Sequence, residues 1–218
     1  MNRKITIIVI IAFITIITIE FYLDTIPEIF PWGNDLGNII YGVCLSIVAG
    51  FIFYFFTTYI PQKEAKKKLK PIIDKNIEKI HGSFLSLIKQ LQKDTDFVFN
   101  EIPNENEFVK LLDSKSIHEK VNVIDYQGNY YTFIKYFLVK KRDVQHYINT
   151  IQKYKEWTSI ETLLLLNELE TSGFFSQTEM MNNVKLKIAD IKMSKLSGSF
   201  YSAFKIAKDL NTLKGKKA

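Results

Sequence analysis

The fold is decided by residues 39–60, IIYGVCLSIVAGFIFYFFTTYI, an apolar run without a charged side chain. As a helix rising 1.5 Å per residue, this run is long enough to cross a hydrocarbon core of about 30 Å. Residues 5–23, ITIIVIIAFITIITIEFYL, form another apolar run, the first in chain order, whose only charge, Glu20, lies near its end. A cleaved signal peptide is the alternative for this first run, but its length and the missing small-residue cleavage site favour an uncleaved helix. The sequence therefore predicts a transmembrane hairpin over residues 1–61, whose second span ends at Pro61.

Basic residues predict the orientation of this hairpin. Arg3 and Lys4 precede the first run, and the connection 24–38 holds no basic residue. A group of five lysines follows Pro61: Lys63, Lys66, Lys67, Lys68 and Lys70. Because loops rich in lysine and arginine stay in the cytoplasm, both termini are predicted to be cytoplasmic. The five lysines are expected to contact anionic head groups at the membrane surface, although any second span of this topology carries such a flank.

Small residues recur every fourth position in the second run, at Gly42, Ser46 and Gly50. This spacing gives a helix a flat stripe that a neighbouring helix can approach closely. Two interpretations stay open, which are packing against residues 5–23 of the same chain and contact between two copies. The second interpretation predicts a homo-oligomer.

Charge and composition limit the function classes. The 218 residues carry a net charge of +6, and residues 1–60 hold two basic and four acidic side chains, so the remainder carries +8. Its lysines alternate with glutamates, which makes nucleic acid an unlikely partner and favours anionic lipids, an anionic signal or a protein. The three histidines and Cys44 lack metal-ligand spacing, and the glycines form no phosphate-binding loop. No cofactor or metal is therefore expected.

Residues 62–95 are predicted to form a juxtamembrane helix with an apolar seam. The seam consists of Ile73, Ile77, Ile80, Phe84, Leu87 and Leu91, in steps of three and four. Such a seam either packs on the chain's own domain or forms a short parallel coiled coil with a second copy. Both alternatives stay open.

Residues 96–218 are predicted to form a cytoplasmic helical domain, so the fold class is all-α. Helix starts are expected from capping patterns at Asn104 with Glu107, at Thr158 with Glu161, and at Ser176 with Glu179, the last with Phe175 stapled onto Met180. Residues 121–128 break the helical period and are expected to be extended. Helices are further expected over residues 129–154, with Phe133, Phe137, Val144, Ile148 and Ile151 on one face, and over residues 196–213, with Phe200, Phe204, Ala207 and Leu210 inward.

Arg142 and His146 are the candidate catalytic residues. They lie four positions apart on a predicted helix and so share one face, where an arginine can steer RNA and a histidine can transfer protons. The pair loosely resembles the R-x(4–6)-H motif of HEPN ribonucleases, but only three residues separate its members. A solvated helix face shared with Lys141 and Asp143 is the alternative, and it is favoured.

Two stretches resemble a group of uncharacterised bacterial two-span proteins. Residues 30–61, FPWGNDLGNIIYGVCLSIVAGFIFYFFTTYIP, share a Phe-Pro-x-Gly turn and an aromatic end of the span, and residues 147–175, YINTIQKYKEWTSIETLLLLNELETSGFF, are similar to the group's C-terminal region. The resemblance implies a bacterial cytoplasmic (inner) membrane location and a helical tail, and it implies no activity. By association, proteins of this layout are suspected effectors of antiphage defence.

These observations favour a non-enzymatic membrane effector or scaffold whose cytoplasmic helices bind a partner or signal. A membrane-tethered HEPN-like ribonuclease and a small channel or transporter subunit are the alternatives. A channel is the less favoured reading of the hairpin, because neither apolar run carries a charge at its middle.

Overall fold

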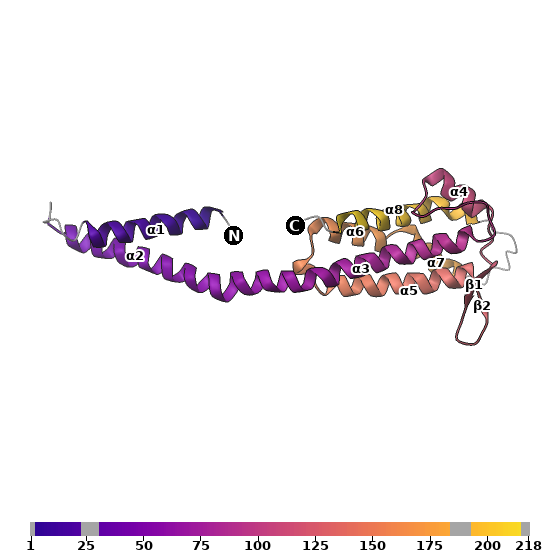
Figure 1. The fold of residues 1–218 in the computed structure, drawn as a ribbon, viewed down its shortest axis with the longest axis horizontal. Coiled ribbons are helices and arrows are strands. Elements are labelled where there is room, and N and C mark those ends of the chain that lie inside the picture. Colours follow the sequence, from indigo (N-terminus) through magenta and orange to yellow (C-terminus); the bar gives the residue numbers. More distant parts are fainter. Residues whose placement is uncertain (1–2, 23–30, 184–192, 215–218) are drawn as a thin grey trace. The chain divides into compact units, whose positions relative to one another are not determined.

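A computed structural model describes residues 3–22, 31–183 and 193–214 of the chain (Figure 1). It is 79% helix and 5% strand, which confirms the all-α class in its main feature. The chain divides into two compact units, Met1–Lys68 (unit 1) and Leu69–Ala218 (unit 2). The boundary falls within helix α3 (Ile60–Gln92), so one helix contributes residues to both units.

Unit 1 consists of two apolar helices, α1 (Arg3–Phe21) and α2 (Gly33–Tyr54), followed by a π-helical turn, η2 (Phe55–Tyr59), and the first residues of α3. Helices α1 and α2 pack along each other. Among the described residues, the structure contains two helices that are long and apolar enough to cross a membrane, and they begin at Arg3 and Gly33.

The backbone stays helical through Pro61, so the prediction that this proline ends the second apolar helix is wrong. Proline lacks an N–H, and its ring collides with the carbonyl four residues earlier in a regular α-helix. The wider π turn directly before Pro61 changes this pattern, because the Ile60 N–H donates to the carbonyl of Phe55, five residues back. The turn thereby lets the helix accommodate Pro61.

Unit 2 is a bundle of helices with one small β-hairpin. After α3 come α4 (Glu105–Asp113), the antiparallel strands β1 (Lys120–Ile124) and β2 (Tyr130–Thr132), α5 (Phe133–Gln152), and a 3-10 turn, η3 (Lys155–Trp157). The chain continues through α6 (Ile160–Glu170), α7 (Gly173–Asn183), the turn η4 (Met193–Leu196) and α8 (Ser197–Leu213).

A cluster of phenylalanine rings forms the centre of the unit 2 core. Phe84 of α3 lies 5.2 Å from Phe174 of α7 and 4.9 Å from Phe204 of α8, measured between ring centroids. Phe108 of α4 and Phe137 of α5 close the cluster through Phe204 and Phe174. Edge-on and tilted pairs of this kind add to the burial of their apolar area, so aromatic packing joins five helices of the unit.

The apolar seam of α3 is buried inside unit 2. All six of its side chains, from Ile73 to Leu91, are at most 6% exposed. Of the two alternatives for the seam, the structure therefore shows packing on the chain's own domain. These side chains are not available for a coiled coil between copies. The apolar faces predicted for residues 129–154 and 196–213 are likewise buried, which confirms both predictions.

The capping predictions have mixed outcomes. Asn104 and Glu107 form the predicted capping box at the start of α4. Helix α6 is capped by Ser159 rather than Thr158, whose hydroxyl donates to the carbonyl of Tyr154 instead. The third prediction is wrong, because α7 already begins at Gly173 and so contains Ser176.

Two further predictions need correction. Phe175 is buried and Met180 is 58% exposed, so they form no staple. The helix predicted over residues 129–154 starts four residues late, because Tyr130–Thr132 pair with β1 as a strand. The extended structure predicted for residues 121–128 is confirmed over β1.

Candidate functional site

The packed face of the α1–α2 hairpin differs from the one that the sequence suggested. Along α2, the partly buried positions follow helical spacing: Gly37, Tyr41, Cys44, Val48 and Phe51. Ala12 of α1 is 3% exposed, and it is the only buried side chain of the described part of unit 1. A small residue at that position lets the two helices approach closely.

The small-residue stripe lies on the opposite side of α2. Gly42, Ser46 and Gly50 are exposed, and a Cβ added at either glycine would meet no atom within 4 Å. At 100° per residue, this stripe points about 180° away from the face that carries Tyr41, Cys44 and Val48. The interpretation that the stripe packs against residues 5–23 is therefore wrong, because α1 covers the other face. Contact with a second copy stays a prediction.

The five lysines after Pro61 are all exposed and lie within the first three turns of α3. Lys70 reaches Asp74, with 3.9 Å between the Nζ and Oδ2 atoms, an ion pair at helical spacing. Exposed pairs of this kind contribute little to stability. The lysines therefore remain oriented toward the surroundings, as a head-group contact requires.

Arg142 and His146 lie on the exposed side of α5. The His146 ring stands edge-on to Tyr147, with 5.7 Å between ring centroids. No hydrogen bond joins the guanidinium to the imidazole in the described part of the chain. The neighbouring Lys141 and Asp143 are engaged elsewhere, with Glu179 and Lys140 respectively. The arrangement is that of an exposed helix face.

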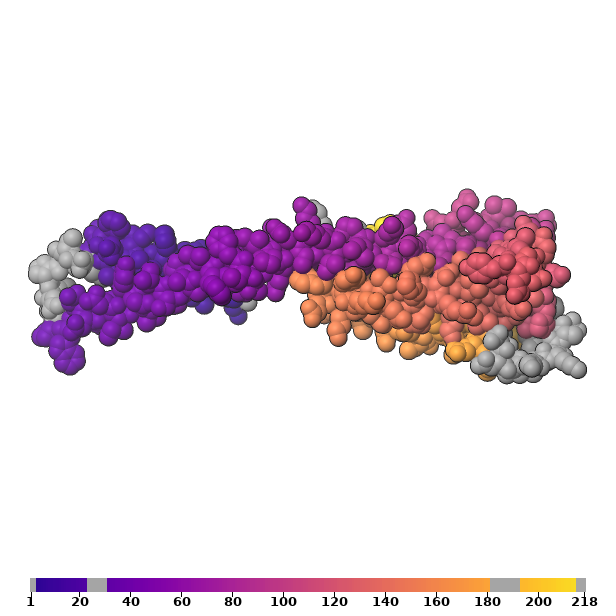
Figure 2. All heavy atoms as spheres, turned by 90° about the horizontal axis from the view of Figure 1, so that it is seen from below, coloured from indigo at the N-terminus to yellow at the C-terminus, as the bar shows by residue number. Residues whose placement is uncertain are grey.

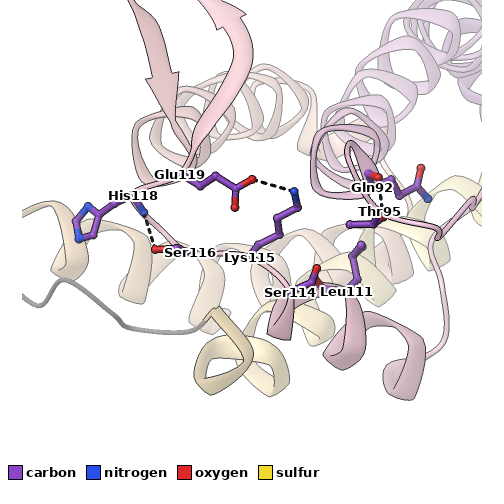
Figure 3. Close-up of polar contacts among 8 residues, drawn as sticks. All are labelled: Gln92, Thr95, Leu111, Ser114, Lys115, Ser116, His118 and Glu119. Carbon is purple, nitrogen blue, oxygen red and sulfur yellow. Dashed lines mark hydrogen bonds and ion pairs between the residues drawn. The ribbon is translucent and has the colours of Figure 1, made fainter.

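A buried lysine is the feature that sequence reasoning missed. Lys115 is 6% exposed, and its Nζ lies 2.9 Å from Glu119 Oε1 (Figure 3). The Lys115 carbonyl accepts from the Met193 N–H, which ties the segment after α4 to η4. Nearby, His118 N–H donates to Ser116 Oγ and Thr95 donates to the Gln92 carbonyl. These bonds hold turns in place, so the group serves the architecture of this end of unit 2.

Ion pairs at the surface and backbone hydrogen bonds lower the pKa values of three carboxyl groups in unit 2. The Lys214 ammonium lowers the pKa of Glu78, and the Lys141 ammonium lowers the pKa of Glu179. Backbone N–H groups of Asn129 and Gln127 lower the pKa of Asp125 in the hairpin turn. Among residues 3–22, 31–183 and 193–214, no group of three or more His, Cys, Asp or Glu is placed to hold a metal ion.

Comparisons of the chain with protein-family models, with curated protein sequences and with solved structures found no match. The resemblance to bacterial two-span proteins therefore stays a prediction. Two exposed surfaces bear on function. They are the apolar exterior of unit 1 and the lysines of residues 63–70 that follow its apolar helices.

Proposed function

We propose that the chain is an integral membrane protein in which α1 and the apolar part of α2 cross the bilayer as a hairpin. The observation that supports this is the outward direction of the apolar side chains in unit 1. Of the 18-residue apolar segment in each helix, only 6% is buried in α1 and none in α2. A core helix of a water-soluble protein would be mostly buried. Lipid is the medium that removes these side chains from water.

The polar side chains of the hairpin support the same proposal. The hydroxyls of Thr15, Thr18 and Ser46 donate to the carbonyls of Ile11, Ile14 and Gly42, each one turn back in the same helix, at 2.8–3.0 Å. A hydrocarbon environment offers no water, so a buried hydroxyl needs a partner within the protein. These three hydroxyls have one without any second helix.

Both ends of the hairpin are proposed to lie in the cytoplasm of a bacterial cell. Lys63, Lys66, Lys67, Lys68 and Lys70 follow the second span, Arg3 and Lys4 precede the first, and the connection 24–38 has no basic residue. Unit 2 then lies on the cytoplasmic side, and the five lysines that follow the second span meet the anionic leaflet.

The function proposed for this architecture is that of a non-enzymatic membrane effector or scaffold. Unit 2 receives a partner protein or an anionic signal, and the hairpins respond in the membrane. Two polar side chains of unit 2 support this proposal. Lys115 forms an ion pair with Glu119 that belongs to the architecture of the unit, and Arg142 lies on an exposed helix face. Bacterial antiphage defence is the proposed setting, by association with proteins of this layout.

The membrane proposal is tested by extraction and by topology. Alkaline carbonate removes peripheral proteins from membranes, and we expect this chain to remain in the pellet. Alkaline phosphatase fused at Trp32 should be active, and a fluorescent protein fused after Ala218 should fluoresce. Release by carbonate, or an inactive phosphatase at Trp32 together with a dark fluorescent protein after Ala218, contradicts the proposal.

Self-association and output are tested together at the exposed stripe of α2. Gly50→Leu adds a large side chain where a Cβ meets nothing within the chain, so the hairpin itself should persist. We expect this change to lower the oligomeric mass in detergent and to abolish any activation-dependent loss of membrane potential. Ile40→Leu, a conservative change at an exposed position of α2, is the control. An unchanged mass and potential would identify the hairpin as an anchor alone.

A further inference from the structure

We propose that the end of unit 2 at which α3 enters it is a second membrane-contact surface, which rests on anionic phospholipid head groups through Trp157, Ile160 and Leu164. The proposal rests on the function proposed above, because it requires that the preceding helices span the bilayer. It adds a binding surface that is separate from the spans and from the lysines of residues 63–70.

Contacts within unit 2 place the turn between α5 and α6 at this end. Helix α5 runs antiparallel to α3, since Tyr136 Oη lies 3.4 Å from Ser86 Oγ and the Lys79 ammonium lies 5.2 Å from the Tyr147 ring centroid. The end of α5 therefore lies beside the first turns of α3 in unit 2. Figures 1 and 2 agree, because the orange segment near residue 155 adjoins α3 at the end where α3 enters unit 2.

Large apolar side chains project outward at this end. Ile160 is 76% exposed and Leu164 is 64% exposed, and their spacing places them on one face of α6. Ile72 on α3 is 41% exposed. Trp157 is partly exposed and packs its remaining surface on the core. Aromatic and aliphatic groups in this combination are typical of surfaces that enter the interfacial layer of a bilayer.

The connection between the span and unit 2 keeps this end near the lipid. Residues 61–68 separate the apolar run from unit 2, and as part of α3 they span about 12 Å. The head-group layer on each side of the hydrocarbon core is about 5–8 Å thick. Even a fully extended connection would reach only about 28 Å. The side chains at the entry end of unit 2 therefore lie within reach of the head groups.

The charges of the turn itself are balanced, and the preference for an anionic leaflet comes from the connection. Lys153 and Lys155 are exposed in the same turn. Glu156 and Glu161 lie there too, so the local charge is balanced and the apolar side chains must contribute to the contact. The lysines of residues 63–70 add positive charge along the connection, which favours anionic lipids over neutral ones.

A second exposed apolar group provides a matched control. Ile124 is 54% exposed, Tyr130 is 50% exposed, and Tyr126 at the tip of the β-hairpin is fully exposed. Figure 1 shows this hairpin at the end of unit 2 opposite the entry of α3. If exposed apolar side chains bound lipid without regard to position, this group would behave like Ile160 and Leu164.

The test uses the full chain in nanodiscs of equal parts phosphatidylcholine and phosphatidylglycerol, with or without bromine on the acyl chains. Trp32→Phe leaves Trp157 as the only tryptophan of the chain. Bromine quenches tryptophan on contact, so we expect weaker Trp157 emission in the brominated nanodiscs. Ile160→Asp with Leu164→Asp should remove this quenching, and Ile124→Asp with Tyr126→Asp should leave it unchanged. Denaturant unfolding of each variant, followed by Trp157 emission, checks that unit 2 is folded.

Equal emission with and without bromine overturns the inference, and so does an equal response of the two double variants. The proposed function fails separately. Trp157→Phe leaves Trp32 as a reporter of the hairpin connection, and carbonate extraction reports the spans. Retention in the membrane and quenching of Trp32, together with an unquenched Trp157, would overturn only the contact proposed here.

Discussion

Phenylalanine occurs in both units of the molecule, yet Phe53 of α2 is 70% exposed and Phe204 of α8 is 0% exposed. The large hydrophobic side chains of α1 and α2 mostly point outward, whereas those of unit 2 mostly form one core. Similar apolar residue types are thus exposed in unit 1 and buried in unit 2. In unit 2 the chain itself forms the core, whereas most apolar side chains of α1 and α2 lie outside any core of the described structure.

The polar bonds of the two units differ in the same way. In unit 1 the hydroxyls of Thr15, Thr18 and Ser46 bond within their own helix. In unit 2 polar side chains also join distant elements, such as Lys214 with Glu78 and Gln177 with Ser199. The described polar contacts therefore help to specify how the helices of unit 2 dock.

The largest effect is expected from the same substitution placed in each unit. Phe204→Ala removes a ring that packs edge-on or tilted against Phe84 and Phe108, so unit 2 should lose about 3–5 kcal/mol of unfolding free energy. Phe53→Ala removes an outward-facing ring and should leave that free energy unchanged. Guanidinium unfolding in detergent, followed by Trp157 emission in a Trp32→Phe background, measures both. Similar losses for the two variants would contradict the division into two units.

The sequence predicts the helical faces of unit 2 because spacing alone carries that information. The α3 seam, for example, follows directly from steps of three and four residues. Spacing does not say what covers a face. For both the α3 seam and the Gly42 stripe, the sequence therefore did not distinguish packing within the same chain from contact with a second copy. The structure covers the first within unit 2 and leaves the second exposed.

Other misses arise where non-local pairing decides the local structure. Tyr130–Thr132 become a strand because β1 pairs with them. In the turn between the two strands, Asp125 Oδ1 accepts hydrogen bonds from two backbone N–H groups, and Gly128 has a φ of 82°. The Tyr-Tyr-Thr composition was a readable signal for a strand. Burial of Lys115 had no sequence signal, since lysine is ordinarily exposed.

A second comparison places one methyl group in each unit. Gly173→Ala puts a Cβ 2.3 Å from Ser199 Cβ, between α7 and α8, and relief of this clash should destabilise unit 2 by about 1–3 kcal/mol. Gly50→Ala adds the same atom where nothing lies within 4 Å. It should leave the hairpin intact. Unfolding curves for the two variants measure the difference in destabilisation. Equal stability of the two variants would show that α7 and α8 move apart at no cost to accept the added methyl group.

The starts of α4 and α2 offer a smaller contrast. Asn104 caps α4 by accepting from the Glu107 N–H at 3.0 Å, whereas Trp32 precedes α2 without a side-chain cap. Asn104→Ala should cost unit 2 about 1 kcal/mol. Trp32→Ala should leave the helical content of the detergent-solubilised protein unchanged. Chemical unfolding and circular dichroism measure the two effects. A stability loss below the detection limit for Asn104→Ala would show that the first turn of α4 is frayed.

The smallest expected effect is a pH dependence confined to unit 2. Partial burial lowers the pKa of His81 from its ordinary value of 6.5. The nearby Lys208 and Lys214 lower it further, while Glu101 opposes them. The folded protein then binds fewer protons at His81 than the unfolded chain does, so stability rises with pH. This contribution is complete above pH 6.5 and is lost as the pH falls through the folded pKa.

His81→Gln should therefore flatten the decline in unit 2 stability between pH 7 and pH 5. The carboxyl groups of Glu78, Asp125 and Glu179 also have lowered pKa values, but their ordinary values of 4.5, 3.8 and 4.5 place their contributions below this window. His146→Gln, on the exposed side of α5, controls for the loss of an imidazole. Unfolding midpoints followed by Trp157 emission at several pH values provide the measurement. Two outcomes would contradict this prediction. One is an unchanged dependence of stability on pH in His81→Gln, and the other is a wild-type protein that becomes more stable as the pH falls to 5. Either would mean that His81 is solvated in the folded state and that α8 packs less tightly against α3 than the structure shows.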